Sequence, residues 1–129
     1  MANHEEHLET AAVVAWASYF PELKNLMGIP NGAHLAGTTK QRAAKMARLK
    51  KEGFRKGASD LFLPVAKKGF HGMWIEMKRA RGGAVSADQK DFINDMTEAG
   101  YYAVVCRGAE EAIKAITNYM NLRGKGDEI

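Results

Sequence analysis

The stretch Trp74-Ile75-Glu76-Met77-Lys78 places a carboxylate and an amine two residues apart among apolar side chains. In an extended strand the apolar residues Ile75 and Met77 would face one side, and Glu76 and Lys78 the other. A buried ionisable side chain must be paired or bind a metal, because an isolated buried charge is costly. Asp60, sixteen positions upstream of Glu76, heads a second strand-like run. Together these side chains predict a divalent-metal site with an attendant lysine, which suits hydrolysis of a phosphate ester.

The composition is that of one folded domain. The 129 residues are 46% apolar and 26% charged, which fits a single unit that we expect to span residues 1–122, with a frayed tail at 123–129. No apolar run is long enough to cross a membrane, and the acidic N-terminus lacks the features of a signal peptide. The lone Cys106 lies in an apolar run, where a buried and inert thiol is expected. These features predict a cytoplasmic protein.

Basic residues are concentrated in two places. The formal net charge is +4, which alone says little about partners. The larger cluster comprises Lys40, Arg42, Lys45, Arg48, Lys50, Lys51, Arg55 and Lys56, and the smaller comprises Lys67, Lys68, Lys78, Arg79 and Arg81. Basic charge that flanks a metal-carboxylate centre fits a polyanionic substrate, although a solvated helix face is an alternative for each lysine.

Hydrophobic periodicity and turn residues predict four helices and three strands. The helices are expected at 4–20, 38–52, 86–99 and 109–122, and the strands at 60–66, 71–79 and 101–107. The first two strands would form an antiparallel hairpin, and the intervening helix would make the second and third strands parallel. The predicted fold class is α/β, with a small mixed sheet flanked by helices.

Local signals add detail to these elements. The first helix is indicated by apolar residues at helical spacing, namely Leu8, Ala11, Ala12, Ala15 and Tyr19. Pro21 would end it or open a short extra turn. Residues 28–32 are predicted as a loop. The helix at 38–52 has a weak predicted cap, because Thr39 is followed three residues later by Arg42 rather than by an acid.

The residues of the candidate site suit phosphate chemistry. Asp60 and Glu76 offer the carboxylate oxygens that a hard ion such as Mg²⁺ prefers, and the backbone carbonyl of Met77 would lie nearby. Lys78 would orient or deprotonate the attacking water, or stabilise charge on the phosphate. Opposite charges on one face of a strand are common, so a structural pair of Glu76 and Lys78 on an exposed face stays open.

Three ordered segments resemble a known family. Gly57-Ala58-Ser59-Asp60, Ile75-Glu76-Met77-Lys78 and Ser86-Ala87-Asp88-Gln89 resemble the virus-type replication-repair nuclease (VRR-NUC) domain of the restriction-endonuclease-like superfamily, which is marked by Asp and then Glu-x-Lys. The resemblance covers nearly the whole chain. It implies a restriction-endonuclease-like fold and a DNA endonuclease dependent on Mg²⁺ or Mn²⁺. Asp60 and Glu76 would be metal ligands, and Lys78 the catalytic lysine.

The resemblance implies two further site residues. An acidic residue on the first helix is expected as a metal ligand, and Glu6 is the match, with Glu9 as the alternative and a solvated acid near the helix start as the non-functional interpretation. Gln89 matches the family glutamine, but Ser86-x-x-Gln89 is also a capping box, and both roles stay open. Ser59 departs from the proline that relatives usually have, which loosens the expected placement of Asp60.

The leading functional hypothesis is a structure-selective DNA endonuclease that resembles Holliday-junction resolvases. Such an enzyme acts on branched DNA as a homodimer, because two cuts need two sites. Val14, Tyr19 and Phe20 are candidates for the interface, although they could equally pack against the sheet. A phage-infected or bacterial cell is typical of such relatives. Alternatives are a flap or nicking nuclease of the same fold, and a catalytically silent nucleic-acid-binding module. A sequence-specific restriction enzyme would need a base-reading segment, which is not evident.

Overall fold

The computed structural model describes residues 2–30 and 35–122, so the predicted tail at 123–129 lies outside the described residues. The elements are α1 (Ala2–Ala17), the short 3₁₀ helix η1 (Pro21–Leu23), β1 (Met27–Gly28), α2 (Thr39–Lys51), β2 (Leu61–Leu63), β3 (Met73–Lys78), α3 (Ala87–Glu98), β4 (Tyr102–Arg107) and α4 (Ala109–Met120). Each predicted helix and strand is present, and η1 begins at Pro21 as the extra turn predicted there.

The four strands form one mixed sheet in the order β1-β2-β3-β4. β2 and β3 pair antiparallel as a hairpin, and β3 and β4 pair parallel across α3, which confirms both predicted pairings. The expectation of a loop at 28–32 was wrong at its first residue, because Met27 and Gly28 pair with β2 as an edge strand, and residues 31 and 32 lie outside the described residues. β2 is shorter than the predicted 60–66, because Pro64, which has no amide hydrogen to donate, follows its last residue.

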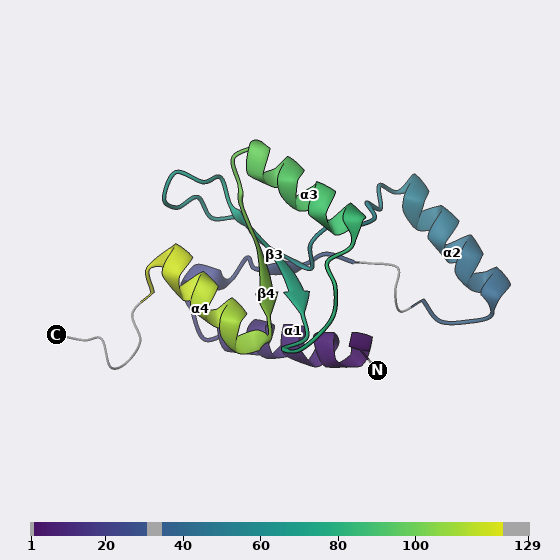
Figure 1. Ribbon diagram of the computed structural model, residues 1–129, viewed down its shortest axis with the longest axis horizontal. Coiled ribbons are helices and arrows are strands. Elements are labelled where there is room, and N and C mark those ends of the chain that lie inside the picture. Colours follow the sequence, from purple (N-terminus) through teal and green to yellow (C-terminus); the bar gives the residue numbers. More distant parts are fainter. Residues whose placement is uncertain (1, 31–34, 123–129) are drawn as a thin grey trace.

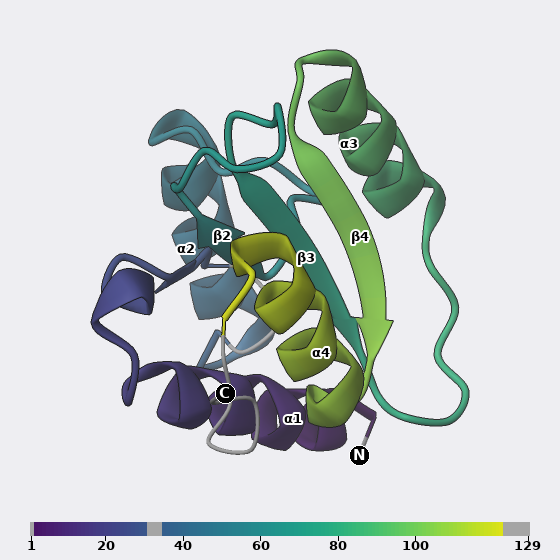
Figure 2. The ribbon, with the colours of Figure 1, turned by 90° about the vertical axis from the view of Figure 1, so that its left-hand side faces the viewer.

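Helices cover the two faces of the sheet unequally. In Figures 1 and 2, α1 and α4 lie against one face, α3 lies against the other, and α2 stands apart from the rest. The core forms between the sheet and the α1–α4 layer; its fully buried members include Val13, Leu61, Leu63, Met73, Ile75, Met77 and Ile116. Cys106 belongs to this core, and burial raises the pKa of its thiol to about 12, as expected for an inert thiol. No helix in the described part of the chain is long and apolar enough to span a membrane.

The face of α1 that packs on the sheet is not the one that the apolar spacing indicated. Val13 and Ala17 are buried, whereas Leu8 and Tyr19 are 54% and 84% exposed. Small apolar residues surround most of this helix, so spacing alone does not choose a face. The buried face continues back along the helix to Glu6, since residues three and four apart share a face.

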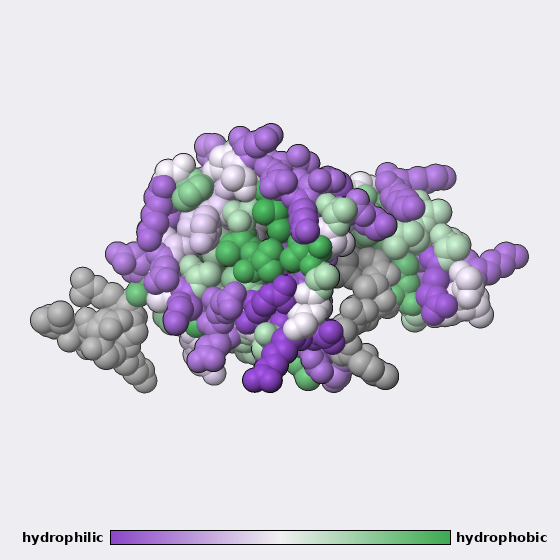
Figure 3. Space-filling view, in the orientation of Figure 1, coloured by the Kyte–Doolittle hydropathy of each residue, from purple (hydrophilic) through white to green (hydrophobic). Residues whose placement is uncertain are grey.

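α2 begins at a strong cap rather than the weak one expected. The cap is Thr38, one residue earlier than predicted, and it forms a capping box in which Thr38 and Gln41 exchange two hydrogen bonds of 3.2 and 2.8 Å. α2 has no buried residue. The larger basic cluster lies on α2 and the segment after it, and all eight of its residues are exposed. Figure 3 shows hydrophilic side chains projecting from this helix, and an apolar area over the strands between α3 and α4.

Candidate active site

Asp60 and Glu76 face each other across the β2–β3 pair. Leu61 pairs with Ile75 in the antiparallel register, so one step further along places Asp60 opposite Glu76. The Asp60 carboxylate is fixed by the Met77 amide, which donates a hydrogen bond of 2.7 Å to its Oδ2. Ser59, where relatives usually have a proline, is fully buried, and Asp60 still lies opposite Glu76. Two carboxylates on adjacent strands therefore lie at one end of the hairpin.

Glu76 is buried beside other acids. Its side chain is almost fully enclosed, with the residue only 2% exposed. Burial, followed by the negative charge of Asp60, raises the pKa of Glu76 to about 9; the Lys78 ammonium opposes this rise, and Glu6 adds to it. The metal-free carboxyl is therefore protonated at neutral pH, and it becomes an anion there only if a positive charge arrives.

Lys78 lies beside Glu76 on the same face of β3, and both are buried. The Lys78 Nζ is 3.8 Å from Oε2 of Glu76 and donates a hydrogen bond of 3.0 Å to Oε1 of Gln89. The Gln89 Nε2 donates in turn to Oε2 of Glu76 at 3.2 Å. The three side chains thus form a closed network that fixes the ammonium next to the carboxyl. The alternative of an exposed Glu-Lys pair is wrong, because Lys78 is only 6% exposed.

Gln89 forms the predicted capping box and also contacts both Lys78 and Glu76. The Ser86 hydroxyl accepts from the Gln89 amide at 3.1 Å, and Oε1 of Gln89 accepts from the Ser86 amide at 2.9 Å, which is a capping box at the start of α3. The same Oε1 accepts from Lys78, and Nε2 reaches Glu76. One side chain therefore caps the helix and also holds the side chains of Glu76 and Lys78 in place.

The two acidic candidates on α1 have different surroundings. Oε2 of Glu9 accepts a hydrogen bond of 3.1 Å from the Ala109 amide at the first turn of α4, where a carboxylate offsets the free amides and dipole of a helix start. Sequence reasoning did not identify this role. The Glu6 carboxylate instead lies beside Gly83, in the loop after β3, and its charge acts on Glu76. Glu9 is therefore engaged at the start of α4, whereas the charge of Glu6 acts on the site.

The residues fit a divalent cation, although they do not enclose one. Oε1 of Glu76 is buried and has no hydrogen-bond partner among the described residues, so one oxygen is free to bind a cation. Across residues 2–30 and 35–122, no three acidic, histidine or cysteine side chains converge into a metal-binding cluster. Mg²⁺ usually takes one or two protein carboxylates and completes its shell with waters and substrate phosphate. Asp60 and Glu76 match that pattern, and Glu6 stands further out.

The smaller basic cluster is divided between the two ends of β3. Lys67 and Lys68 lie in the turn before β3, and the pairing of Leu63 with Met73 places that turn at the start of the strand. Lys78 is at the other end, so the expectation that Lys67 and Lys68 flank the site was wrong. Loop 79–86 leaves the site end, where Nη1 of Arg107 donates to the carbonyls of Gly82 and Gly83 at 2.5 and 3.0 Å.

Comparison with known proteins identifies the family of this arrangement. The model of the VRR-NUC domain matches residues 1–110. The chain belongs to the VRR-NUC domain family. The matched region includes α1, all four strands and α3, and it ends in the first turn of α4. VRR-NUC membership implies a nuclease of the restriction-endonuclease-like fold with DNA as its substrate.

A solved structure supports the fold. A chain described as a VRR_NUC domain protein superposes with a TM-score of 0.76 at 24% sequence identity, and the alignment covers 91% of this chain and 88% of that chain. At this identity the likeness shows the fold alone. A search of curated proteins finds no match.

Proposed function

We propose that this VRR-NUC chain is a structure-selective DNA endonuclease that depends on Mg²⁺ or Mn²⁺ and cuts branched DNA in the manner of a Holliday-junction resolvase. The observation that carries the proposal is the geometry at the end of the hairpin. Asp60 and Glu76 face each other, and Gln89 fixes Lys78 beside them. A module that only binds nucleic acid has no need of a buried carboxyl with one unpartnered oxygen.

Asp60 and Glu76 are the proposed metal ligands, with Glu6 contributing negative charge from α1 and the Met77 carbonyl as a further proposed ligand. The bound ion would act as a Lewis acid toward the phosphate and make water a better nucleophile at neutral pH. The backbone amide of Met77 orients Asp60, and the side-chain amide of Gln89 orients Glu76. These hydrogen bonds fix the direction in which each carboxylate presents its free oxygen.

Lys78 is the proposed catalytic lysine. Its ammonium is enclosed by protein and held by Gln89 and Glu76, so it would meet the scissile phosphate without losing further rotamer freedom. In this position it would orient the attacking water or stabilise the negative charge that develops on the phosphate. In-line attack would leave a 5′-phosphate and a 3′-hydroxyl.

The basic cluster on and after α2 is the proposed surface for the DNA backbone. Its exposed lysines and arginines would neutralise phosphates on one side of the site, which predicts affinity that falls steeply as salt rises. We propose a homodimer, because resolution of a junction needs incisions in two strands and each copy supplies one site. Val14 and Tyr19 on α1 are 44% and 84% exposed and suit the proposed interface, whereas Phe20 is half-buried against Trp16.

The decisive experiment uses charge-removing variants of nearly unchanged shape. Asp60→Asn and Glu76→Gln should lose most cleavage of a labelled four-way junction in Mg²⁺ or Mn²⁺, and EDTA should abolish wild-type cleavage. Glu6→Gln should lower cleavage and Glu9→Gln should not, which makes these two a matched pair on one helix. Near wild-type rates for Asp60→Asn or Glu76→Gln would show that the proposed site is wrong.

The same assay separates the alternatives. A flap and a linear duplex are incubated beside the junction, and light scattering at micromolar protein gives the oligomeric state. A monomer that nicks flaps and ignores junctions would replace the resolvase proposal with a flap or nicking nuclease of the same fold. A protein that binds these substrates and cleaves none of them with either metal would be a silent binding module.

A further inference from the structure

A hollow of about 360 Å³ lies next to the proposed active site, within the range of small-molecule sites, roughly 300–1,000 Å³. Its walls come from the end of α2 and the segment after it, from β3 and from α3, and they include Leu49, Phe54, Trp74 and Phe92. The rings of Trp74 and Phe92 meet edge to face with centroids 5.0 Å apart. The hollow is therefore an apolar recess to which three aromatic side chains contribute.

The hollow and the proposed site lie next to each other on the same face of β3. Trp74 and Glu76 lie two residues apart on one face of β3, about 7 Å along the strand. α3 spans both, because Gln89 contacts Glu76 and Phe92 contacts Trp74. Successive nucleotides in a stacked strand rise about 3.4 Å, so for a DNA strand that runs along β3 the recess would lie about two nucleotides from a phosphate at the proposed site.

Basic charge borders the recess. Arg55 lines it with its guanidinium 5.9 Å from the centre of the Phe92 ring, and the side chain stays half exposed beside Asp95. Lys56 is the next residue and is more exposed still. Glu52 is the acid in the wall, and its carboxylate offers an acceptor for an amino group. A ligand that is flat, apolar on its faces and attached to a polyanion matches this combination.

The geometry points to a pocket for one unpaired nucleobase, inserted about two nucleotides from the cut; this inference rests on the proposed nuclease function. A base inside a duplex presents its faces only to its stacked neighbours, whereas an unpaired base can leave the stack and enter a recess. Stacking on aromatic rings tolerates any base. The rings of Phe54, Trp74 and Phe92 would supply the aromatic contacts. The pocket would thus favour branched or gapped DNA without reading sequence.

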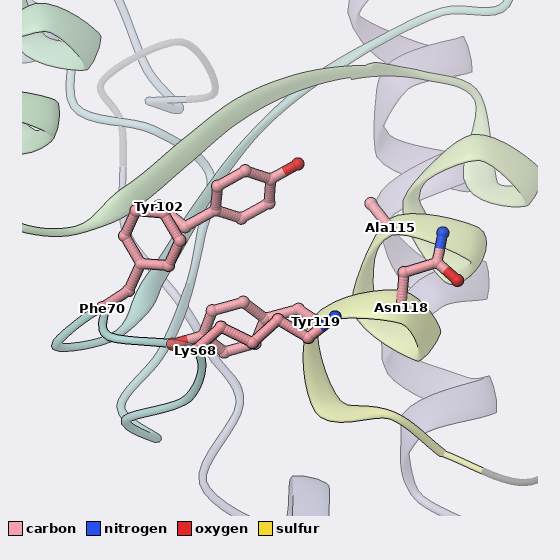
Figure 4. Close-up of a pocket in the computed structure, with 6 residues that line it drawn as sticks. All are labelled: Lys68, Phe70, Tyr102, Ala115, Asn118 and Tyr119. Atoms are coloured by element: carbon pink, nitrogen blue, oxygen red, sulfur yellow. The ribbon is translucent and has the colours of Figure 1, made fainter.

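A second aromatic hollow serves as the control. Figure 4 shows Phe70, Tyr102 and Tyr119 around a space of about 210 Å³, with Lys68 beside them. Tyr102 pairs with the core residue Met73 and stacks on Tyr119 of α4, so this hollow lies on the α4 side of the sheet, opposite the face that carries Glu76 and Lys78. An aromatic ring on that side cannot hold a base beside the cut, so Phe70→Ala is a matched partner for Phe54→Ala.

The test uses Trp74 as its reporter. The chain has two tryptophans, and Trp16→Phe leaves Trp74 as the only emitter. In EDTA, this protein is titrated with a duplex carrying one bulged nucleotide, the same duplex with an abasic bulge, and a fully paired duplex. The bulged base should quench Trp74 and should bind at least about 5-fold more tightly than the abasic bulge. Phe54→Ala should remove this preference, and Phe70→Ala should keep it.

Equal affinity for the base and the abasic bulge, equal quenching by paired duplex, or a preference that survives Phe54→Ala would each overturn the pocket. Cleavage in Mg²⁺ is measured separately with the same duplexes. Cleavage without a base preference would leave the nuclease proposal standing and refute the pocket. A base preference in EDTA without cleavage in Mg²⁺ or Mn²⁺ would support the pocket and refute the nuclease proposal.

Discussion

The two faces of β3 differ in what they contribute to the protein. Ile75 and Met77 point into the core beneath α1 and α4 and are fully buried. Glu76 and Lys78 alternate with them, face α3, and are buried almost as deeply. Burial of the apolar pair stabilises the fold, whereas burial of the ionisable pair costs free energy that only a partner or a cation offsets. One strand thus combines a stabilising face with a strained one, and substitutions on the two faces should have opposite effects.

The largest effect is expected on the core face. Ile75→Ala should lower the free energy of unfolding by about 2–5 kcal/mol, because it removes buried methyl groups and leaves a cavity. Urea denaturation monitored by circular dichroism measures this change. A loss below about 1 kcal/mol would mean that the core face does not carry the stability assigned to it.

The next effect is on chemistry rather than on folding. Lys78→Ala should slow cleavage about 10²-fold or more, equivalent to about 2.7 kcal/mol of transition-state stabilisation. DNA affinity should change little, since one phosphate contact is a small part of a surface with many. Single-turnover cleavage and fluorescence anisotropy separate the two quantities, and Lys78→Met controls for lost packing of the side-chain stem. A fall in affinity that matches the fall in rate would make Lys78 a binding residue.

A smaller effect of opposite sign is expected at Glu76. Burial raises the pKa of this carboxyl from 4.5 to about 9, so the folded chain resists an ionisation that the unfolded chain undergoes. Its contribution to stability is intact below pH 4.5 and is lost progressively as the pH rises toward 9. Glu76→Gln should therefore stabilise the metal-free protein by about 1–3 kcal/mol at pH 7, and by little at pH 4.

Thermal unfolding in EDTA and in Mg²⁺ checks this prediction without any measurement of activity. Mg²⁺ should raise the Tm of the wild-type protein, because a ligand that binds only the folded state stabilises it, and should leave Glu76→Gln nearly unchanged. Equal responses of the two proteins to Mg²⁺ would place the ion elsewhere. A Glu76→Gln variant less stable than wild type at pH 7 in EDTA would show that the site face is not strained.

The smallest effect concerns Ser59. Its hydroxyl is buried and has no hydrogen-bond partner among the described residues. Ser59→Ala should raise the free energy of unfolding by up to about 1 kcal/mol, because it removes an unsatisfied polar group at little cost in packing. Urea denaturation of the variant measures the gain, and a loss of stability would indicate that the hydroxyl has a partner in solution.

The strands were predicted correctly where the apolar pattern of the sequence is strong enough to indicate a strand by itself. The apolar alternation around Glu76 and the helix between 86 and 99 were sufficient to predict β3, β4 and their parallel pairing. β1 was missed because Met27 and Gly28 are extended only through their pairing with β2, which leaves no local signal. The buried face of α1 was predicted wrongly because alanines make much of that helix apolar. Packing against the sheet buries the face that contains Val13.

The sequence predicted that Glu76 and Lys78 share one face of β3, but it did not predict the hydrogen-bond network that holds them. The motif Glu-x-Lys placed Glu76 and Lys78 on one face, but the depth of their burial depends on α3, which lies across them. The choice between Glu6 and Glu9 depends on where α4 begins, since its first amide takes the Glu9 carboxylate. That contact joins residues a hundred positions apart, and no local pattern signals it.

The two sets of contacts made by Gln89 limit which residues can replace it. For the capping box alone, glutamate is as suitable as glutamine three residues after the serine. A glutamate there would place a further negative charge against Glu76 and would remove the amide that orients it. A change that is neutral for the helix would therefore disrupt the network that Gln89 forms with Glu76 and Lys78. Gln89 both caps α3 and contacts Glu76 and Lys78. A substitution at this position therefore requires that another residue first take over one of these roles, for example the cap of α3.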